Sequence, residues 1–276
     1  MEKINRKYIK SIVKQSLSED LKPLGDITTK TIKNKKVTAK IVANEKCIVG
    51  GLDFAKETFK ISDKKISFKG RIKDGKIANK GKIIAVIKGS ASGILRSERV
   101  ALNFLGLISG VATTTNEFVK KIRKKSCKVL CTRKTFPNLR IIQKYGVRLG
   151  GGKNHRFNLS DEILIKDNHI SINNNIRELV KTAIKKNKGK KITVEVDNLK
   201  QLNEVIGLKF DRILFDNMSI KNLRKALKIV KKDYQTEASG GVTLKNIGKI
   251  SSTGVNRISV GKITHSPKNI DFSLTL

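Results

Sequence analysis

The chain has 276 residues, of which 60 are Lys or Arg and 23 are Asp or Glu, so its formal net charge at neutral pH is +37. It has no Trp, 5% aromatic residues, and no apolar run near the ~18 residues that a membrane-spanning helix needs. This composition excludes a membrane-spanning protein. It indicates a soluble protein with a mostly aliphatic core, long enough for one large domain or two.

The excess positive charge favours nucleic acid or another polyanion as a partner on electrostatic grounds. The lysines, however, are spread over every segment, often as KK pairs, and the accompanying Ile and Asn residues indicate a compositional bias. The sequence has no zinc-finger or RNP pattern and no basic patch with interleaved aromatic residues. Polyanion or RNA binding therefore stays an alternative, and nucleic acid is not the expected main partner.

The three cysteines, Cys47, Cys127 and Cys131, cannot all pair with one another, and no further Cys pair or His-x3-His pattern completes a structural zinc site. We expect buried free thiols in a reducing compartment. The N-terminal stretch keeps acidic residues and has no apolar core of a signal peptide. A cytoplasmic location without a membrane partner is therefore expected.

The N-terminal part predicts a helix followed by a β-rich region. Apolar positions at helical spacing predict an amphipathic helix over 4–17, and alternating residues predict a half-buried strand over 37–43. Asp74-Gly75 predicts a hairpin turn between short strands, with a further strand over 83–87. From Ser97 to Ile122 the apolar residues recur at helical spacing, which predicts one or two packed helices. Arg99 lies at the expected start of this helix, where the helix dipole disfavours a cation. This unfavourable position suggests that Arg99 has another interaction partner.

The rest of the chain alternates short apolar runs with helical patterns, which predicts successive βα units and a parallel sheet. The expected strands are 128–131, 146–149, 162–165, 191–196, 212–215, 234–238 and 256–260. The expected helices are 138–145, 172–186, 198–206, 220–231 and 243–251. Seven strands with one repeating connection favour a barrel over an open doubly wound sheet, and the dinucleotide fingerprint G-x-G-x-x-G is absent.

Polar residues and glycines follow the predicted strands, at the end where an α/β barrel builds its active site. They are Arg133, Lys134, Gly150 to Gly152, His155 and Lys166, then Glu195, Asp197 and Asp216, then Ser239 to Gly241 and Gly261. Arginines can bind carboxylates bidentately, paired carboxylates can hold a divalent metal ion, and a glycine turn before a helix can bind phosphate. The residues therefore predict a barrel enzyme that joins a carboxylated substrate to a metal-bound phosphorylated one.

Several stretches resemble the quinolinate phosphoribosyltransferases, also called nicotinate-nucleotide pyrophosphorylases (carboxylating). They are SERVALNFLGLISGVAT, CTRKTFPNLR, KYGVRLGGGKNHRFNLSDEILIKDNHI, VEVDN, LFDNMS and EASGGVTLKNIGKISSTGVNRISVGKITHS. The resemblance runs from LGDITT at Leu24 almost to the C-terminus. It implies an α/β fold, an incomplete α/β barrel with a mixed α/β, β-sandwich-like N-terminal domain. The implied domains are 1–110 with dimer contacts, 111–264 as the catalytic barrel, and 265–276 as a tail returning to the N-terminal domain.

The resemblance also implies a reaction. The phosphoribosyl group of phosphoribosyl pyrophosphate is transferred to quinolinate with decarboxylation, giving nicotinate mononucleotide, pyrophosphate and CO2 in de novo NAD biosynthesis. Mg²⁺ is the implied metal ion, and no organic cofactor is needed because phosphoribosyl pyrophosphate is a co-substrate. The family forms homodimers in which the N-terminal domain of one subunit covers the barrel mouth of the other. A higher oligomer stays open.

Residue roles follow from the matching motifs. The implied basic pocket for the two quinolinate carboxylates is Arg133, Lys134, His155, Arg156 and Lys166, joined by Arg99 from across the dimer interface. Glu195 and Asp216 serve Mg²⁺, directly or through the substrate, and the ribose. The implied 5′-phosphate cradle is Ser239, Gly240, Gly241 and Gly261, and further substrate contacts are Thr132, Ser259 and Val260. Lys134, Lys166, Glu195 and Asp216 are the expected catalytic residues.

Two alternatives keep the enzyme class. The TRKTFP version of the first basic motif also occurs in a related group of pyridine-carboxylate phosphoribosyltransferases associated with molybdate transport. That group usually departs from the KDNH pattern, which is intact here at Lys166-Asp167-Asn168-His169 and favours quinolinate. The second alternative changes the acceptor to nicotinate or another pyridine acid.

Overall fold

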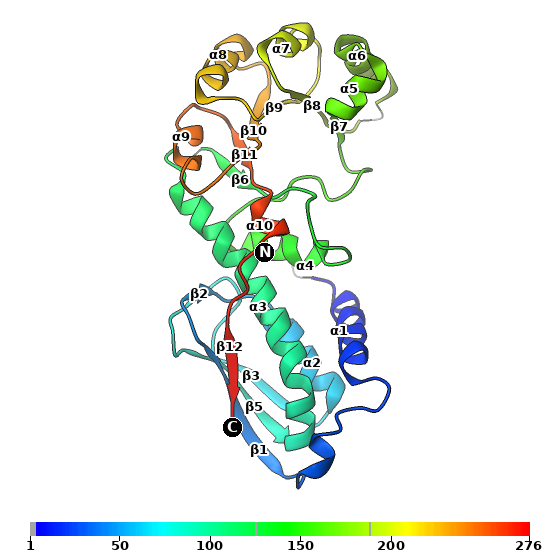
Figure 1. Ribbon diagram of the computed structural model, residues 1–276, viewed down its shortest axis with the longest axis vertical. Helices are drawn as coiled ribbons and strands as arrows, with labels where there is room; N and C mark the ends of the chain where they lie inside the picture. Colours follow the sequence, from blue (N-terminus) through cyan, green and yellow to red (C-terminus); the bar gives the residue numbers. More distant parts are fainter. Residues whose placement is uncertain (1–3, 125, 188) are drawn as a thin grey trace. The chain divides into compact units, whose positions relative to one another are not determined.

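The computed structural model describes residues 4–124, 126–187 and 189–276, and the chain forms two compact units (Figure 1). The first unit contains the chain up to Thr115, the segment Pro137–Gly151 and the C-terminal Ser266–Leu276. The second contains Asn116–Phe136 and Gly152–His265. An antiparallel sheet in the first unit and a six-stranded parallel sheet in the second confirm the α/β fold class. The expected barrel domain, 111–264, differs from the second unit mainly by the segment Pro137–Gly151.

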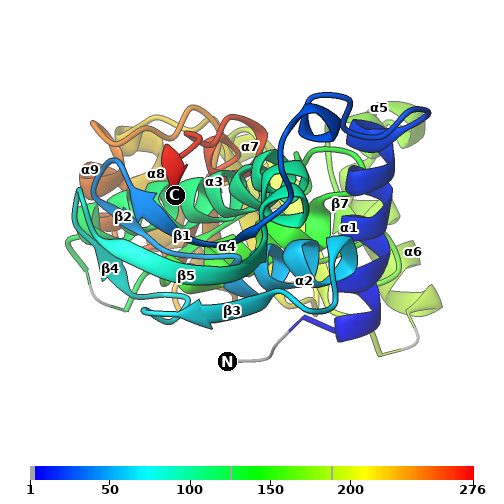
Figure 2. The ribbon, with the colours of Figure 1, turned by 90° about the horizontal axis from the view of Figure 1, so that it is seen from below.

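The first unit is built on a four-stranded antiparallel sheet with the order β12-β1-β5-β3, part of which Figure 2 shows. Its strands are β1 (Lys36–Ala43), β3 (Ser67–Gly70), β5 (Ile83–Ser90) and β12 (Phe272–Thr275). Ala39, Ile41 and Ala43 are fully buried along one face of β1, as the alternation predicts. Because β12 pairs with β1, with Leu274 opposite Ile41, the C-terminal residues complete the sheet of this unit.

Helices pack around this sheet, together with the short pair β2 (Cys47–Ile48) and β4 (Ile77–Ala78). They are α1 (Arg6–Leu21), η1 (Thr29–Thr31), α2 (Leu52–Ser62), α3 (Ala91–Lys121) and α4 (Arg140–Leu149). The predicted first helix is confirmed: Ile9, Val13 and Leu17 recur every fourth residue, and all three are buried. Asn5 caps it by accepting a hydrogen bond from the Lys7 N–H at 2.8 Å.

The predicted strand over 146–149 is wrong, because these residues form the last turns of α4. The glycines of this segment explain why. A Cβ at Gly146 would lie 2.9 Å from the Cβ of Val111, and one at Gly150 would lie 2.3 Å from the carbonyl oxygen of Ala112. These glycines let α4 approach α3 closely, so Gly150 serves helix packing and not an anion pocket.

Two further predictions in the first unit need correction. Asp74-Gly75 does form a turn, but β3 and β4 on either side of it pair with β5 and β2 and not with each other, so there is no hairpin. The helix expected from Ser97 begins at Ala91 and continues unbroken to Lys121. Arg99 therefore lies two turns inside α3, and the argument from the dipole at a helix start does not apply to it.

The second unit contains a six-stranded parallel sheet with the order β6-β11-β10-β9-β8-β7. The strands are β6 (Lys128–Leu130), β7 (Ile163–Ile165), β8 (Ile192–Val196), β9 (Arg212–Asp216), β10 (Gln235–Ser239) and β11 (Arg257–Ser259). They match six of the seven predicted strands. Most residues of β8 and β9 are buried on both faces, as expected for strands covered by crossover helices.

Helices follow the strands of this unit, and Figure 1 shows α6, α7 and α8 along one side of the sheet. They are α5 (Asp167–Asn173), α6 (Ile176–Lys186), α7 (Leu199–Val205), α8 (Ile220–Val230), α9 (Ile247–Ser251) and α10 (Lys262–His265). Asn175, Asn198 and Ser219 cap α6, α7 and α8 through their side chains. The expected helix over 172–186 is broken at Asn174, whose φ is +53°. The expected helix over 243–251 is shorter than predicted, because only α9, Ile247–Ser251, is helical.

Among the described residues, none of the helices combines the length and apolar character needed to cross a membrane. Cys47, Cys127 and Cys131 are buried, and none of them forms a disulfide in the described part of the chain, which confirms the prediction of buried thiols.

Candidate active site

The carboxyl ends of the parallel strands surround a cavity of about 480 Å³ in the second unit. The predicted site residues that line it are Thr132, Arg133, Lys134, His155, Arg156, Lys166, Glu195, Asp216, Ser239 and Ser259. Leu164, Asp167, Leu214 and Glu237 complete the lining. Residues that span more than a hundred positions of sequence are therefore brought together by the parallel arrangement, because each strand ends at the same edge of the sheet.

One side of the cavity is basic and under-compensated. The Nε of Arg133 is buried and has no hydrogen-bond partner among the described residues. Arg156 is only 8% exposed, and its pKa is lowered by burial and then by the charge of Arg133. Two like-charged guanidinium groups close together in a place with little solvent favour an anion between them. Thr132 orders the turn after β6, since its Oγ1 accepts the Lys134 N–H at 3.1 Å.

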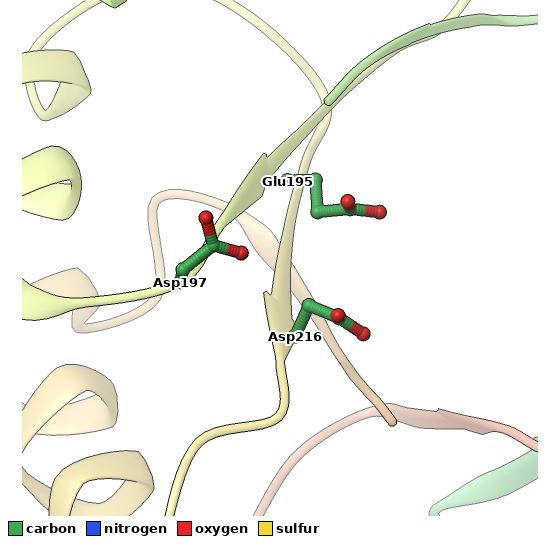
Figure 3. Close-up of side chains that lie close together, drawn as sticks. All are labelled: Glu195, Asp197 and Asp216. Carbon is green, nitrogen blue, oxygen red and sulfur yellow. The ribbon is translucent and has the colours of Figure 1, made fainter. Parts of the chain in front are cut away.

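Another part of the site is acidic. Carboxylate oxygens of Glu195, Asp197 and Asp216 lie within 4.8 Å of one another, and Figure 3 shows these side chains at the ends of β8 and β9. The pKa of Glu195 is raised to about 7, first by burial and then by the charge of Asp216, while Lys166 lowers it. Carboxylates that repel one another in a part-buried place are a suitable oxygen ligand set for a divalent cation.

The third part is a turn with unusual backbone angles. Gly240 and Gly241 follow β10 with φ of +84° and +55°. A Cβ at Gly240 would lie 2.1 Å from the Oδ1 of Asn217, whereas one at Gly241 would meet nothing within 4 Å. Asn217 itself has a φ of +50° and donates from Nδ2 to Asp216 Oδ2 at 2.6 Å. Asn217 thus connects the acidic part of the site with the glycine turn. The turn does not open a helix directly, because α9 begins only at Ile247.

The chain matches two domain models of one known protein family. Residues 26–109 match the quinolinate phosphoribosyl transferase N-terminal domain, and residues 111–275 match the C-terminal domain of the same family. The chain belongs to the quinolinate phosphoribosyltransferase family. The resemblance expected from the motifs is therefore confirmed.

Individual relatives of this phosphoribosyltransferase cover nearly its whole length. Proteins called probable nicotinate-nucleotide pyrophosphorylase (carboxylating) from Bacillus subtilis and Methanocaldococcus jannaschii are 39% and 43% identical. The matches cover 98% of this chain in both cases, and 94% and 97% of theirs. A solved nicotinate-nucleotide pyrophosphorylase from Francisella tularensis has a TM-score of 0.94 at 40% identity, covering 99% of this chain and 97% of its own. Human nicotinic acid phosphoribosyltransferase, with a TM-score of 0.59 at 9% identity, covers 99% of this chain and 75% of its own and shares the fold alone.

Some predicted site residues of this phosphoribosyltransferase do not line the cavity. Arg99 is exposed on α3, in the first unit. Val260 is buried, and its N–H donates to the carbonyl oxygen of Leu130 at 2.9 Å, so its part in the second unit is to extend the pairing of β6 and β11. Gly261 lies beside Lys134, whose Cδ would be 3.5 Å from an added Cβ.

Two other predicted contacts line the cavity but are hydrogen-bonded inward. The Nε2 of His155 lies 3.4 Å from Glu237 Oε1, and the hydroxyl of Ser259 donates to the same oxygen. His169 is also engaged, since its Nδ1 accepts the Lys166 N–H at 3.2 Å and orders the chain after β7. Of the three histidines, His155 and His169 thus have clear roles in shaping the backbone next to the cavity.

Asp197 follows a predicted strand, as expected, but the motifs imply no role for it, and Glu237 is not among the expected site residues. Glu237 is fully buried in the middle of β10, within a run whose pattern predicts an apolar strand. A charged residue in a strand covered on both faces was the available signal, because burial of a charge needs a partner. The same signal marks Arg212, which is 1% exposed at the start of β9.

Proposed function

We propose that the protein transfers the phosphoribosyl group of phosphoribosyl pyrophosphate to quinolinate and releases pyrophosphate and CO2, forming nicotinate mononucleotide in de novo NAD biosynthesis. Family membership supports this activity. The observation that carries it is the cavity itself, of about 480 Å³, whose lining combines buried cations with carboxylates that could hold a metal ion. A dicarboxylate suits one side, and a metal-bound pyrophosphate ester suits the other.

The basic side would hold and orient quinolinate. Arg133, Arg156 and Lys166 offer charge-assisted hydrogen bonds to its two carboxylates, and Lys134 lies next to them in the same lining. The pyridine nitrogen then forms a bond to C1 of the ribose while the C1–O bond breaks, and pyrophosphate leaves with the electron pair. Loss of the 2-carboxylate as CO2 passes its bonding electrons to the pyridinium ring, and a proton takes the vacated position. Positioning and electrostatic stabilisation supply the catalysis.

The acidic side fits a hard divalent cation such as Mg²⁺. Its donors are all carboxylate oxygens, and the raised pKa of Glu195 reflects burial and like charges that a cation would relieve. Glu195 and Asp216, joined by Asp197, would hold the ion, which would neutralise the pyrophosphate as it departs. Ser239 and the backbone N–H groups of Gly240 and Gly241 would bind the 5′-phosphate of the ribose. No organic cofactor is required.

We also propose a homodimer with shared active sites. Its support is that each unit exposes apolar side chains of the kind that interfaces cover. In the first unit these are Leu24 and Ile27, 70% and 63% exposed, and in the second Leu159 and Ile172, 69% and 80% exposed. Arg99 on the first unit would then reach the quinolinate site of the partner. The buried thiols, which form no disulfide among the described residues, suit a reducing cytoplasm.

The test of the function is release of CO2 from carboxyl-labelled quinolinate in the presence of phosphoribosyl pyrophosphate and Mg²⁺, with nicotinate as the competing acceptor. We expect CO2 release and mononucleotide formation from quinolinate, and little product from nicotinate. Equal or better turnover of nicotinate would contradict the assignment. Salt-sensitive RNA binding without any turnover would support the polyanion alternative.

Removal of Arg133 tests the basic side of the cavity. We expect Arg133→Ala to raise the KM for quinolinate at least tenfold, since a charge-assisted hydrogen bond contributes about 1.5–3 kcal/mol. Steady-state kinetics with each substrate varied in turn measures the effect. An Arg133→Ala enzyme with wild-type affinity and turnover would rule out this binding mode.

A further inference from the structure

A buried carboxylate lies directly beneath the basic side of the cavity. Glu237 is fully buried on β10, and its Oε1 accepts hydrogen bonds from His155 Nε2 and the Ser259 hydroxyl. Burial raises the Glu237 pKa, but the hydrogen bonds from His155 and Ser259 and the charge of Arg212 together bring the pKa below its ordinary value. Glu237 is therefore an ionised group in the protein interior, and it needs its partners.

The imidazole of His155 is engaged on both nitrogens. Its Nε2 donates to Glu237, and its Nδ1 accepts the backbone N–H of Arg156 at 2.7 Å. A nitrogen that accepts a hydrogen bond carries no proton, so the ring is neutral with its proton on Nε2. Its side chain is only 7% exposed. In this state neither ring nitrogen is available to donate to a bound carboxylate.

A second set of contacts leads from Arg156 back to Glu237. Arg156 Nη1 donates to the carbonyl oxygen of Glu162 at 3.0 Å, and the Glu162 carboxylate accepts from Arg212 Nη1 at 3.0 Å. Arg212 is 1% exposed, also donates to Thr193 Oγ1, and places its Nε 3.9 Å from Glu237 Oε2. The path Glu237–His155–Arg156–Glu162–Arg212 thus returns to Glu237 through an ion pair, although Arg212 Nε and Glu237 Oε2 form no hydrogen bond with each other or with any other described residue. We call these five residues the Glu237 ring.

We propose that the Glu237 ring is a device that positions the Arg156 guanidinium, and that His155 and Glu237 are positioning residues that do not themselves contact the substrate. The ring holds Arg156 at two points, the backbone nitrogen and Nη1, and leaves the rest of the guanidinium for an anion in the cavity. Only the identity of that anion, a quinolinate carboxylate, rests on the proposed function.

Glu237→Gln is the sharpest variant, because it keeps the size and one acceptor oxygen and removes the charge that faces His155 and Arg212. We expect a folded enzyme whose KM for quinolinate rises about tenfold or more, because removing one partner of a buried charge pair weakens binding to this degree. Its KM for phosphoribosyl pyrophosphate should stay within about twofold of the wild-type value. Glu178→Gln, the same change on the exposed surface of α6, is the matched control. If the two KM values of Glu237→Gln rise together, or neither rises, the ring does not position Arg156.

Substitutions of His155 separate positioning from direct binding, and serve also if Glu237→Gln fails to fold. Gln can donate to Glu237 from its amide, whereas Ala offers no donor. We expect His155→Ala to lose about tenfold in quinolinate affinity and His155→Gln to stay within about threefold of wild type. Equal losses in both variants would mean that a charged imidazole binds the substrate, which would overturn the proposal.

A measurement without substrate keeps this inference separate from the proposed function. Nitrogen NMR of protein labelled at its three histidines reports which ring nitrogen carries a proton, and His155→Gln assigns the signal. We expect His155 to be neutral and protonated at Nε2 near neutral pH. A doubly protonated ring would overturn the ring as drawn, whereas absence of quinolinate turnover in the wild-type enzyme would count against the function alone.

Discussion

Each unit of the chain contains a half-buried carboxyl group with a raised pKa, Asp74 in the first unit and Glu195 in the second, and the two units surround these groups in opposite ways. In the first unit Asp74 accepts the N–H groups of Gly51 and Leu52 at 2.9 and 3.2 Å and the Tyr145 hydroxyl at 2.9 Å. In the second unit no hydrogen bond reaches the Glu195 carboxylate from any residue that the structure describes. Among its charged neighbours, Asp216 has the largest effect on the Glu195 pKa. Burial raises the pKa of both, but only Asp74 has several hydrogen-bond donors that offset the rise.

The difference separates a scaffold group from a site group. Gly51 is the N-cap residue of α2, has a left-handed conformation and has no side chain to cap the helix, so Asp74 supplies the missing acceptor from a distant turn. Lys166 attracts the Glu195 carboxylate, but burial and repulsion from Asp216 outweigh that attraction, and the pKa of Glu195 rises to about 7. A part-buried carboxylate whose charge the protein compensates only in part indicates a bound cation or substrate.

The largest expected effect comes from Glu195→Gln. We expect kcat/KM to fall by about 100-fold or more, because an electrostatic group of the reaction is lost while the shape is kept. The thermal midpoint should equal or exceed that of the wild type, since one of the repelling charges is gone. Kinetics and calorimetry on the same preparation measure both. Loss of activity together with a clear drop in stability would instead place Glu195 with the scaffold.

The next largest effect is expected from a substitution in the glycine turn. Gly240→Ala must both adopt a φ of +84° and displace the Asn217 amide, which would lie 2.1 Å away. We expect its KM for phosphoribosyl pyrophosphate to rise about tenfold or more, with quinolinate binding unchanged. Gly241→Ala is the matched control, because it has a φ of +55° but open space. If both variants behave alike, backbone strain and not the contact with Asn217 decides the effect.

A smaller effect concerns pH and metal. The folded Glu195 pKa of about 7 lies above its ordinary value of 4.5, so the metal-free protein loses the associated stability as pH rises through that interval. Binding of Mg²⁺ favours the ionised carboxylate and reverses this loss. We therefore expect Mg²⁺ to raise the thermal midpoint more at pH 8 than at pH 6. Glu195→Gln should abolish the difference, and an equal shift at both pH values in the wild type would argue against Glu195 as a ligand.

The smallest effect on activity should come from the scaffold carboxyl. We expect Asp74→Asn to lower the free energy of unfolding by about 1–2 kcal/mol, because the amide replaces one acceptor oxygen with a donor that faces backbone N–H groups. Both KM values should stay near those of the wild type. Urea unfolding and steady-state kinetics test this. Altered quinolinate binding in Asp74→Asn would show that the contrast between the two carboxyl groups is wrong.

Much of the second unit could be predicted because its signals are local. Buried runs such as Ile192–Val196 and Arg212–Asp216 lie between capped helices, and parallel strands covered on both faces leave that pattern. The run over 146–149 misled because a short apolar stretch does not distinguish a strand from a buried helix turn. Only the close approach of Gly146 and Gly150 to α3 shows that this run is helical, and that contact joins residues far apart in the chain.

By itself the sequence determined the α/β class, the family and which residue types gather after the strands, since these depend on periodicity and on motif order along the chain. The tertiary structure alone decided which of those residues face the cavity and which face one another. His155 and Ser259 both lie in matched motifs, yet both turn to Glu237, a group without any sequence signal except its charge inside a strand. A buried carboxylate must be satisfied by whatever donors the fold brings within reach, and that choice is made in three dimensions.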